Sequence, residues 1–154
     1  MPIIGIEEYA ILRPVRAPSG CVAASAEKRI SSAVIANAGW YTFISNTEFP
    51  YGIKNSPIKI SNDHMRWYTA SKVNLLIGSD DIGFKSLNTS KGAQIQGSNR
   101  FERANNYFNT LIKEAEKNNY VLRWNFKVLD DIDHDYKKIT PIAAEILLHN
   151  IETI

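Results

Sequence analysis

A chain of 154 residues is the usual size of one domain and buries roughly two-thirds of the surface that its unfolded state exposes. Hydrophobic residues make up 44% of the sequence and charged residues 22%, which excludes a disordered or fibrous chain. One cysteine, Cys21, excludes an internal disulfide and a multi-cysteine zinc site, while a net charge of +2 is compatible both with a polyanionic partner and with none.

The sequence predicts a cytoplasmic protein that does not enter membranes. No stretch approaches the ~18 apolar residues of a membrane-spanning helix. The first fifteen residues, MPIIGIEEYAILRPV, include two glutamates where a signal peptide has an unbroken apolar run. A single cysteine is typical of a protein made for a reducing compartment.

The first third of the chain predicts a strand, a helix and a second strand. GIEEYAILRPV (5–15) is apolar and is interrupted at Pro14, which indicates a strand and a turn. Apolar residues then recur every four positions from Val22 to Val34, with Gly39 where a helix would stop. GWYTFIS (39–45) is rich in aromatic and β-branched residues, as strands are.

The middle of the chain predicts strands separated by irregular segments. Two prolines and a glycine make NTEFPYGIKNSP (46–57) an irregular connection. IKIS (58–61) and SKVNLLIGS (71–79) are strand candidates. Residues 79–97 are rich in Gly, Ser, Asn and Asp and predict a loop, with a short strand at AQIQ (93–96).

Residues 99–119 have the clearest helical pattern. The apolar positions form one stripe, made of Phe101, Ala104, Phe108, Leu111, Ile112 and Ala115. At about 100° per residue, Tyr107 lies at the edge of this stripe and Arg103 lies further towards water. The two side chains are four positions apart and can touch. They form either the polar shoulder of an amphipathic helix or part of a phosphate site.

The last third predicts a strand and a terminal helix. YVLRWNFKVL (120–129) alternates between an apolar face and a face that carries Arg123 and Lys127. Thr140 is suited to cap a helix whose first residue is Pro141. Together, these elements predict an α+β fold with a small mixed or antiparallel sheet flanked by about three helices. No repeat or change of composition divides residues 1–154, so we expect a single domain.

Several kinds of chemistry lack their usual signatures. The three histidines, His64, His134 and His149, are far apart and no HExxH motif occurs. No GxSxG elbow marks a serine nucleophile, and Cys21 is either a small buried thiol or a thiol with a lowered pKa. The aspartates of the segment DDIDHD (130–135) indicate a solvated loop, since the glycine and glutamate of a calcium loop are missing.

The segments from residue 39 onward nevertheless resemble the GIY-YIG nuclease family. GWYTFIS resembles its first strand, with Gly39, Trp40 and Tyr41 on the GIY positions. FERANNYF resembles its first helix, NYVLRWNFKVLDDID its third strand, and TPIAAEILLHNIE the helix that carries its glutamate. This resemblance divides the chain into a strand and helix added at 1–38 and a nuclease-like core at 39–154 with an insertion at about 54–97.

The resemblance implies metal-dependent hydrolysis of a nucleic-acid phosphodiester. Arg103 would bind the scissile phosphate, Glu145 would hold one Mg²⁺ or Mn²⁺, and Tyr41 with Tyr107 would position or deprotonate the water. Three further cations would contact the nucleic-acid backbone, namely Arg100, Arg123 and Lys127.

A second interpretation is a small non-enzymatic binding or inhibitor protein. Such a protein would use an aromatic and basic surface on a macromolecular partner. It would also explain why no YIG tripeptide closely follows Gly39. The two interpretations differ in whether Tyr41, Arg103, Tyr107 and Glu145 converge on one cavity.

Overall fold

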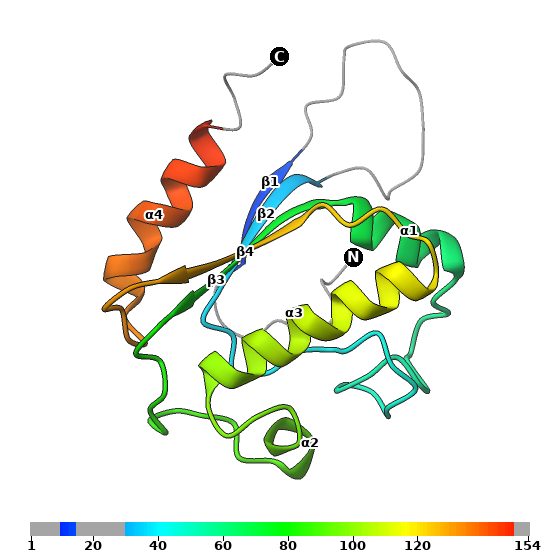
Figure 1. The fold of residues 1–154 in the computed structure, drawn as a ribbon, viewed down its shortest axis with the longest axis horizontal. Helices are drawn as coiled ribbons and strands as arrows, with labels where there is room; N and C mark the ends of the chain where they lie inside the picture. The colour runs from blue at the N-terminus through cyan, green and yellow to red at the C-terminus, as the bar shows by residue number, and fades with distance from the viewer. Residues whose placement is uncertain (1–9, 15–29, 150–154) are drawn as a thin grey trace.

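A computed structural model describes residues 10–14 and 30–149 of the chain. These residues form four strands and four helices in the order β1 (Ala10–Pro14), β2 (Ile30–Ala36), α1 (Asn62–Ala70), β3 (Lys72–Gly78), α2 (Lys91–Gln94), α3 (Arg100–Lys117), β4 (Trp124–Leu129) and α4 (Tyr136–His149). The fold is α+β with one small mixed sheet, as the sequence predicts (Figure 1).

The strands lie in the sheet in the order β1-β2-β3-β4. β1 is antiparallel to β2, whereas β2, β3 and β4 are parallel to one another. β3 is buried on both faces, which explains its nearly continuous apolar sequence. β4 lies at one end of the sheet and exposes Lys127, a common protection of an edge strand.

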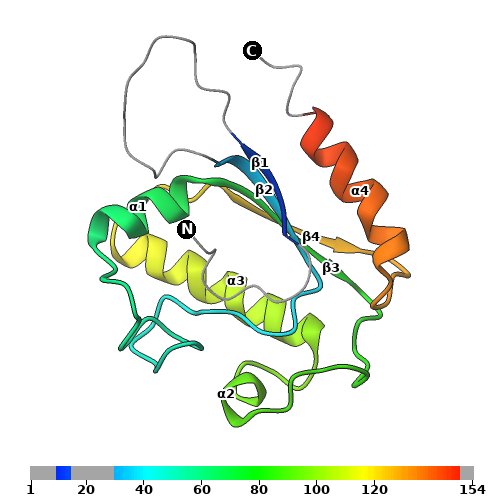
Figure 2. The same ribbon diagram turned by 180° about the vertical axis from the view of Figure 1, so that it is seen from behind.

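Helices cover both faces of the sheet (Figures 1 and 2). On one face, α3 and Tyr68 of α1 pack against inward residues of the strands, among them Ile35 and Leu75. On the other face, α4 packs against Val34 and Leu76. Within the described residues, no helix is long and apolar enough to span a membrane.

β3, α3 and β4 confirm the strongest sequence patterns, and β1 confirms the first strand in its described part. The predicted helix from residue 22 is wrong where it can be compared, because Ile30–Ala36 is strand β2. Alternate residues of β2 pack into the hydrophobic cores on opposite faces of the sheet. The segment therefore follows the two-residue period of a strand, although apolar residues at every fourth position also suggested a helix. Residues 1–9 and 15–29 of the predicted N-terminal addition lie outside the described residues.

Two predicted strands at 39–45 and 58–61 are also wrong. The backbone of Tyr41 makes its hydrogen bonds with the side chain of Gln96 and not with a neighbouring strand. Ser61 is the N-cap of α1, a helix that the sequence analysis missed.

Two further boundaries differ from the expectations. AQIQ is not a strand, because its first two residues are the end of α2, which begins after the capping residue Ser90, and its last two form a turn. α4 begins before Thr140, since Asp135 Oδ1 accepts a hydrogen bond from Lys137 N at 2.8 Å, and Pro141 lies inside the helix.

Candidate active site

The carboxyl ends of β2, β3 and β4 meet at one edge of the sheet because these strands are parallel. This edge is where parallel sheets commonly bind ligands. Asp81 follows β3 after two residues, and His134 follows β4 after four. The two side chains, 53 positions apart in sequence, meet there.

Asp81 and His134 form a hydrogen-bonded pair. His134 Nδ1 lies 3.1 Å from Asp81 Oδ2. An ionised carboxylate can only accept a hydrogen bond, so Nδ1 of the ring carries the proton and donates it. Asp81 is buried, with 1% of its side chain exposed, whereas His134 is 29% exposed. The imidazole of His134 is therefore partly in contact with water, whereas the carboxylate of Asp81 obtains its hydrogen bonds from protein groups.

Arg100, at the start of α3, supplies the main partner of Asp81. Its Nη1 lies 3.4 Å from Asp81 Oδ1, and its Nη2 donates to the carbonyl oxygens of Ser86 and Lys85 at 2.7 and 3.1 Å. The guanidinium thus holds both the carboxylate and the loop that follows it. This arrangement leaves Oδ2 of Asp81 directed at His134.

Backbone hydrogen bonds join the loop after β3 to the loop after β4. Ser79 N donates to Leu129 O at 2.9 Å, and Asp80 N donates to Ile132 O at 3.0 Å. Asp131 N in turn donates to Ser79 Oγ at 3.0 Å. The Asp81–His134 distance is therefore fixed by main-chain contacts as well as by the two side chains.

Arg103 occupies a different place from the one the sequence suggested. It is buried, and its guanidinium donates to the backbone carbonyls of Gly39, Gly97 and Asn88 at 2.6, 2.9 and 3.0 Å. Burial, followed by the neighbouring Arg100 charge, lowers the pKa of Arg103. Its role in the structure is to join three loops.

Tyr41 and Tyr107 do come together, but inside the core. Their rings stack with centroids 4.5 Å apart, and the hydroxyl of Tyr107 is hydrogen-bonded to that of Tyr68. Burial is the first cause of a raised pKa in all three tyrosines. A phenol whose pKa is raised is a poorer general base at neutral pH.

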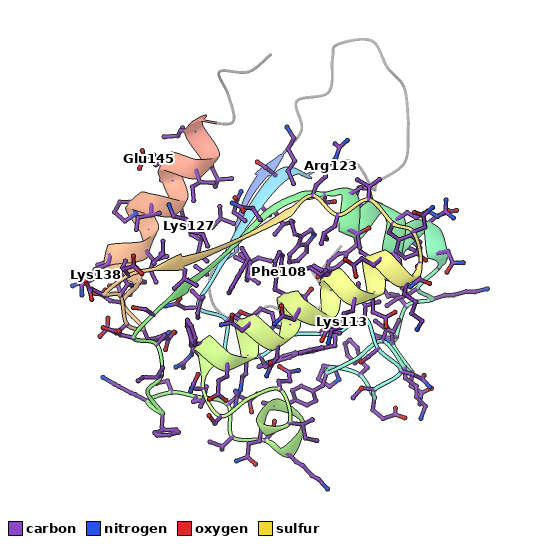
Figure 3. The ribbon with its side chains drawn as sticks, viewed as in Figure 1. Phe108, Lys113, Arg123, Lys127, Lys138 and Glu145 are labelled. Atoms are coloured by element: carbon purple, nitrogen blue, oxygen red, sulfur yellow. The ribbon has the colours of Figure 1, made fainter. Side chains whose placement is uncertain are left out.

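Glu145 does not join the other predicted site residues. It is exposed on α4, which covers the face of the sheet opposite α3, as Figure 3 shows for Glu145 and Phe108. No group of three or more His, Cys, Asp or Glu side chains that could hold a metal ion occurs in the described part of the chain. Nothing in this geometry supports the Mg²⁺ or Mn²⁺ that the nuclease resemblance implied.

The predicted nucleic-acid contacts are also dispersed. Arg100 is buried against Asp81 and cannot reach a phosphate at the surface. Arg123, directly before β4, and Lys127, within it, are both exposed (Figure 3). Asp81 and His134 were not predicted as site residues, although the sequence carries one signal for them, because each follows shortly after a predicted strand.

The solved structures most useful for comparison are hydrolases of polymers. The poly(3-hydroxybutyrate) depolymerase LpqC from Bordetella parapertussis is 26% identical, with a TM-score of 0.70 over 76% of this chain and 40% of the depolymerase. The poly(aspartic acid) hydrolase-1 from Sphingomonas sp. KT-1 is 28% identical, with a TM-score of 0.71 over 76% of this chain and 45% of the hydrolase. No protein-family model and no curated protein matches the chain.

These likenesses correct the functional interpretation of the sequence. Both neighbours are hydrolases of polyesters or polyamides, so the GIY-YIG resemblance, the nuclease activity and the associated DNA and magnesium binding are wrong. The non-enzymatic binding protein gains no support from them either. The chain spans less than half of the length of each of these two hydrolases.

Proposed function

We propose that this chain carries the acid and the base of a hydrolytic site that cleaves ester bonds. The observation that carries the proposal is the Asp81–His134 hydrogen bond at the carboxyl ends of two adjacent parallel strands. In a nucleophile–histidine–acid triad, the acid orients the imidazole and stabilises its charged form. Asp81 has this role towards His134, whose other ring nitrogen, Nε2, would take the proton of the nucleophile.

The order of the two residues along the chain agrees with this assignment. In α/β-hydrolases the triad occurs in the order nucleophile, acid, histidine. Asp81 precedes His134, so the nucleophile of this site belongs to a segment before Asp81. The likeness to two polymer hydrolases supports the same reaction class, the transfer of an acyl group to water.

The surroundings of the pair favour an uncharged, apolar substrate over a polyanion. The loops that carry the pair, with the first turn of α4, contain six aspartates against three lysines, Lys85, Lys137 and Lys138. Three large apolar side chains next to the pair in sequence are exposed: Ile82, Phe84 and Tyr136, of which Phe84 is 75% exposed. Apolar contact and a negative potential suit a polyester better than poly(aspartic acid).

The direct test is hydrolysis of p-nitrophenyl butyrate and of 3-hydroxybutyrate oligomers, beside oligo-aspartate. We expect ester cleavage that falls by at least about 10³-fold in His134→Ala and Asp81→Asn. His64→Gln is the matched control, because Gln suits the third position of the capped helix α1. Equal activity in His134→Ala and His64→Gln, or a folded wild-type protein without hydrolysis, would refute the proposal. Faster cleavage of oligo-aspartate would overturn the ester as the bond cleaved and leave the roles of Asp81 and His134 standing.

A further inference from the structure

Asn37 is a buried polar residue directly after β2, at the same edge of the sheet as the Asp81–His134 pair. Only 1% of it is exposed, and its φ of 47° is in the left-handed region, which asparagine tolerates better than most residues. Its backbone N donates to Leu76 O at 3.1 Å. The main chain of Asn37 is thereby held beside β3, and its side chain points towards the loops beyond.

The side-chain amide of Asn37 connects the ends of β3 and β4. Its Oδ1 accepts a hydrogen bond from Gly78 N at 3.1 Å, and its Nδ2 donates to Asp133 O at 3.1 Å. The opposite amide orientation would place donor against donor and acceptor against acceptor, so the two partners determine the orientation. One amide therefore binds the last residue of β3 and the residue immediately before His134.

These contacts fix the place of the histidine relative to its acid. Gly78 is three positions before Asp81, and Asp133 is adjacent to His134. The bridge connects the main chains at the ends of β3 and β4, and it adds to the backbone hydrogen bonds that join the same two loops. A displacement of about 1 Å at a reacting group can lower a rate on the order of 10²-fold.

We infer that Asn37 is a positioning residue that holds His134 in register with Asp81, an inference that rests on the proposed hydrolytic function. Asn37 acts through the Asp133 carbonyl and contacts neither member of the pair by any described hydrogen bond of its side chain. Asparagine supplies one acceptor and one donor at this spacing, whereas aspartate supplies only acceptors.

Two variants separate positioning from folding. Asn37→Gly removes both hydrogen bonds and tolerates the positive φ. Asn37→Asp keeps the acceptor for Gly78 N and loses the donor to Asp133 O. Gln96→Leu is the matched control, because Gln96 is also a buried amide that accepts from and donates to backbone groups, those of Tyr41 at 2.9 and 2.6 Å.

The experiment measures kcat and KM for p-nitrophenyl butyrate, the thermal unfolding midpoint, and the tautomer of the neutral His134 ring from its ¹⁵N chemical shifts. In the wild type and in Gln96→Leu we expect the Nδ1–H tautomer. In both Asn37 variants we expect a mixture of tautomers and a kcat lowered on the order of 10²-fold with little change in KM. Gln96→Leu should lose stability alone. We therefore expect it to have a lower thermal unfolding midpoint but the tautomer and the kcat of the wild type.

The two hypotheses fail in different ways. A folded Asn37→Gly protein that keeps the Nδ1–H tautomer and the kcat of Gln96→Leu would overturn the inference and leave the hydrolytic function standing. A wild-type protein without hydrolysis would overturn the function. The ring tautomer would then still show whether Asn37 holds His134 against Asp81, since that measurement needs no substrate.

Discussion

Arg100 and Asp81 form an ion pair from which water is almost completely excluded. The guanidinium Nη1 lies 3.4 Å from the carboxylate Oδ1, and each side chain is 1% exposed. Asp81 therefore obtains its stabilisation as an anion from the protein. Because Arg100 contacts one oxygen, the other remains available to His134.

Replacing Arg100 by methionine should strongly destabilise the fold. Removing one partner of a buried ion pair leaves an uncompensated charge, at a cost of about 3–5 kcal/mol in the free energy of unfolding. Urea denaturation of Arg100→Met would measure this loss. Arg123→Met, at an exposed position, should change the same free energy by no more than about 0.5 kcal/mol. Similar values for the two variants would mean that the ion pair contributes nothing to stability.

The sequence correctly predicted the helices and strands whose local hydrophobic pattern matches the way they are buried in the fold. α3 carries a long apolar stripe, and its N-cap, Asn99, accepts a hydrogen bond from Glu102 N. β3 is a nearly continuous apolar segment, which suits a strand buried on both faces. β2 was misread, since Ile30 and Val34 fit a helix as well as they fit one side of a strand. The local sequence does not distinguish a helix from a strand here. The segment is a strand because it pairs with β1 and β3.

Neither the chemistry nor the geometry of the candidate site could be predicted from the sequence. A carboxylate and an imidazole 53 positions apart become neighbours only when β3 and β4 pair in parallel, and nothing local to either residue indicates that pairing. The absence of a GxSxG motif also directed the interpretation away from a triad. Arg103 was expected to face water, yet it is buried and donates hydrogen bonds to the carbonyl groups of three loops.

Gly78→Ala should disturb the site through the backbone. A Cβ at this position would lie 2.0 Å from Ile132 O, so the loop that carries His134 must move. We expect a loss of at least about 2 kcal/mol in the free energy of unfolding, as in other overpacked interiors. Gly83→Ala is the control, because no atom lies within 4 Å of its added Cβ. Chemical denaturation of both variants tests this; an unchanged Gly78→Ala would mean that the two loops are not in close contact.

Tyr41→Phe should leave the stability unchanged or raise it by about 1 kcal/mol. The hydroxyl of Tyr41 is buried and has no hydrogen-bond partner among residues 10–14 and 30–149, so its removal relieves a desolvation cost. Tyr68→Phe should instead lower the stability by about 1 kcal/mol, because it takes a partner from the hydroxyl of Tyr107. Differential scanning calorimetry of the two variants, which remove the same atom, gives the comparison. A larger loss for Tyr41→Phe than for Tyr68→Phe would contradict it.

The buried tyrosines should make the protein unstable in alkali. Burial raises the pKa of Tyr41, Tyr68 and Tyr107, so above pH ~10 the unfolded chain loses their protons while the folded chain keeps them. The unfolded state then binds fewer protons, and the free energy of unfolding falls by about 1.4 kcal/mol per pH unit for each such tyrosine. This stabilisation is complete below pH ~10 and disappears as the pH rises further.

Phenolate absorbance and circular dichroism, followed together through an alkaline titration, would measure this effect. The three buried tyrosines should ionise only as the protein unfolds, and Tyr41→Phe should leave two such groups. Ionisation of all seven tyrosines before any loss of helical signal would show that water reaches these hydroxyls in the folded state. The packing of Tyr41 on Tyr107 would then be looser than a centroid separation of 4.5 Å implies.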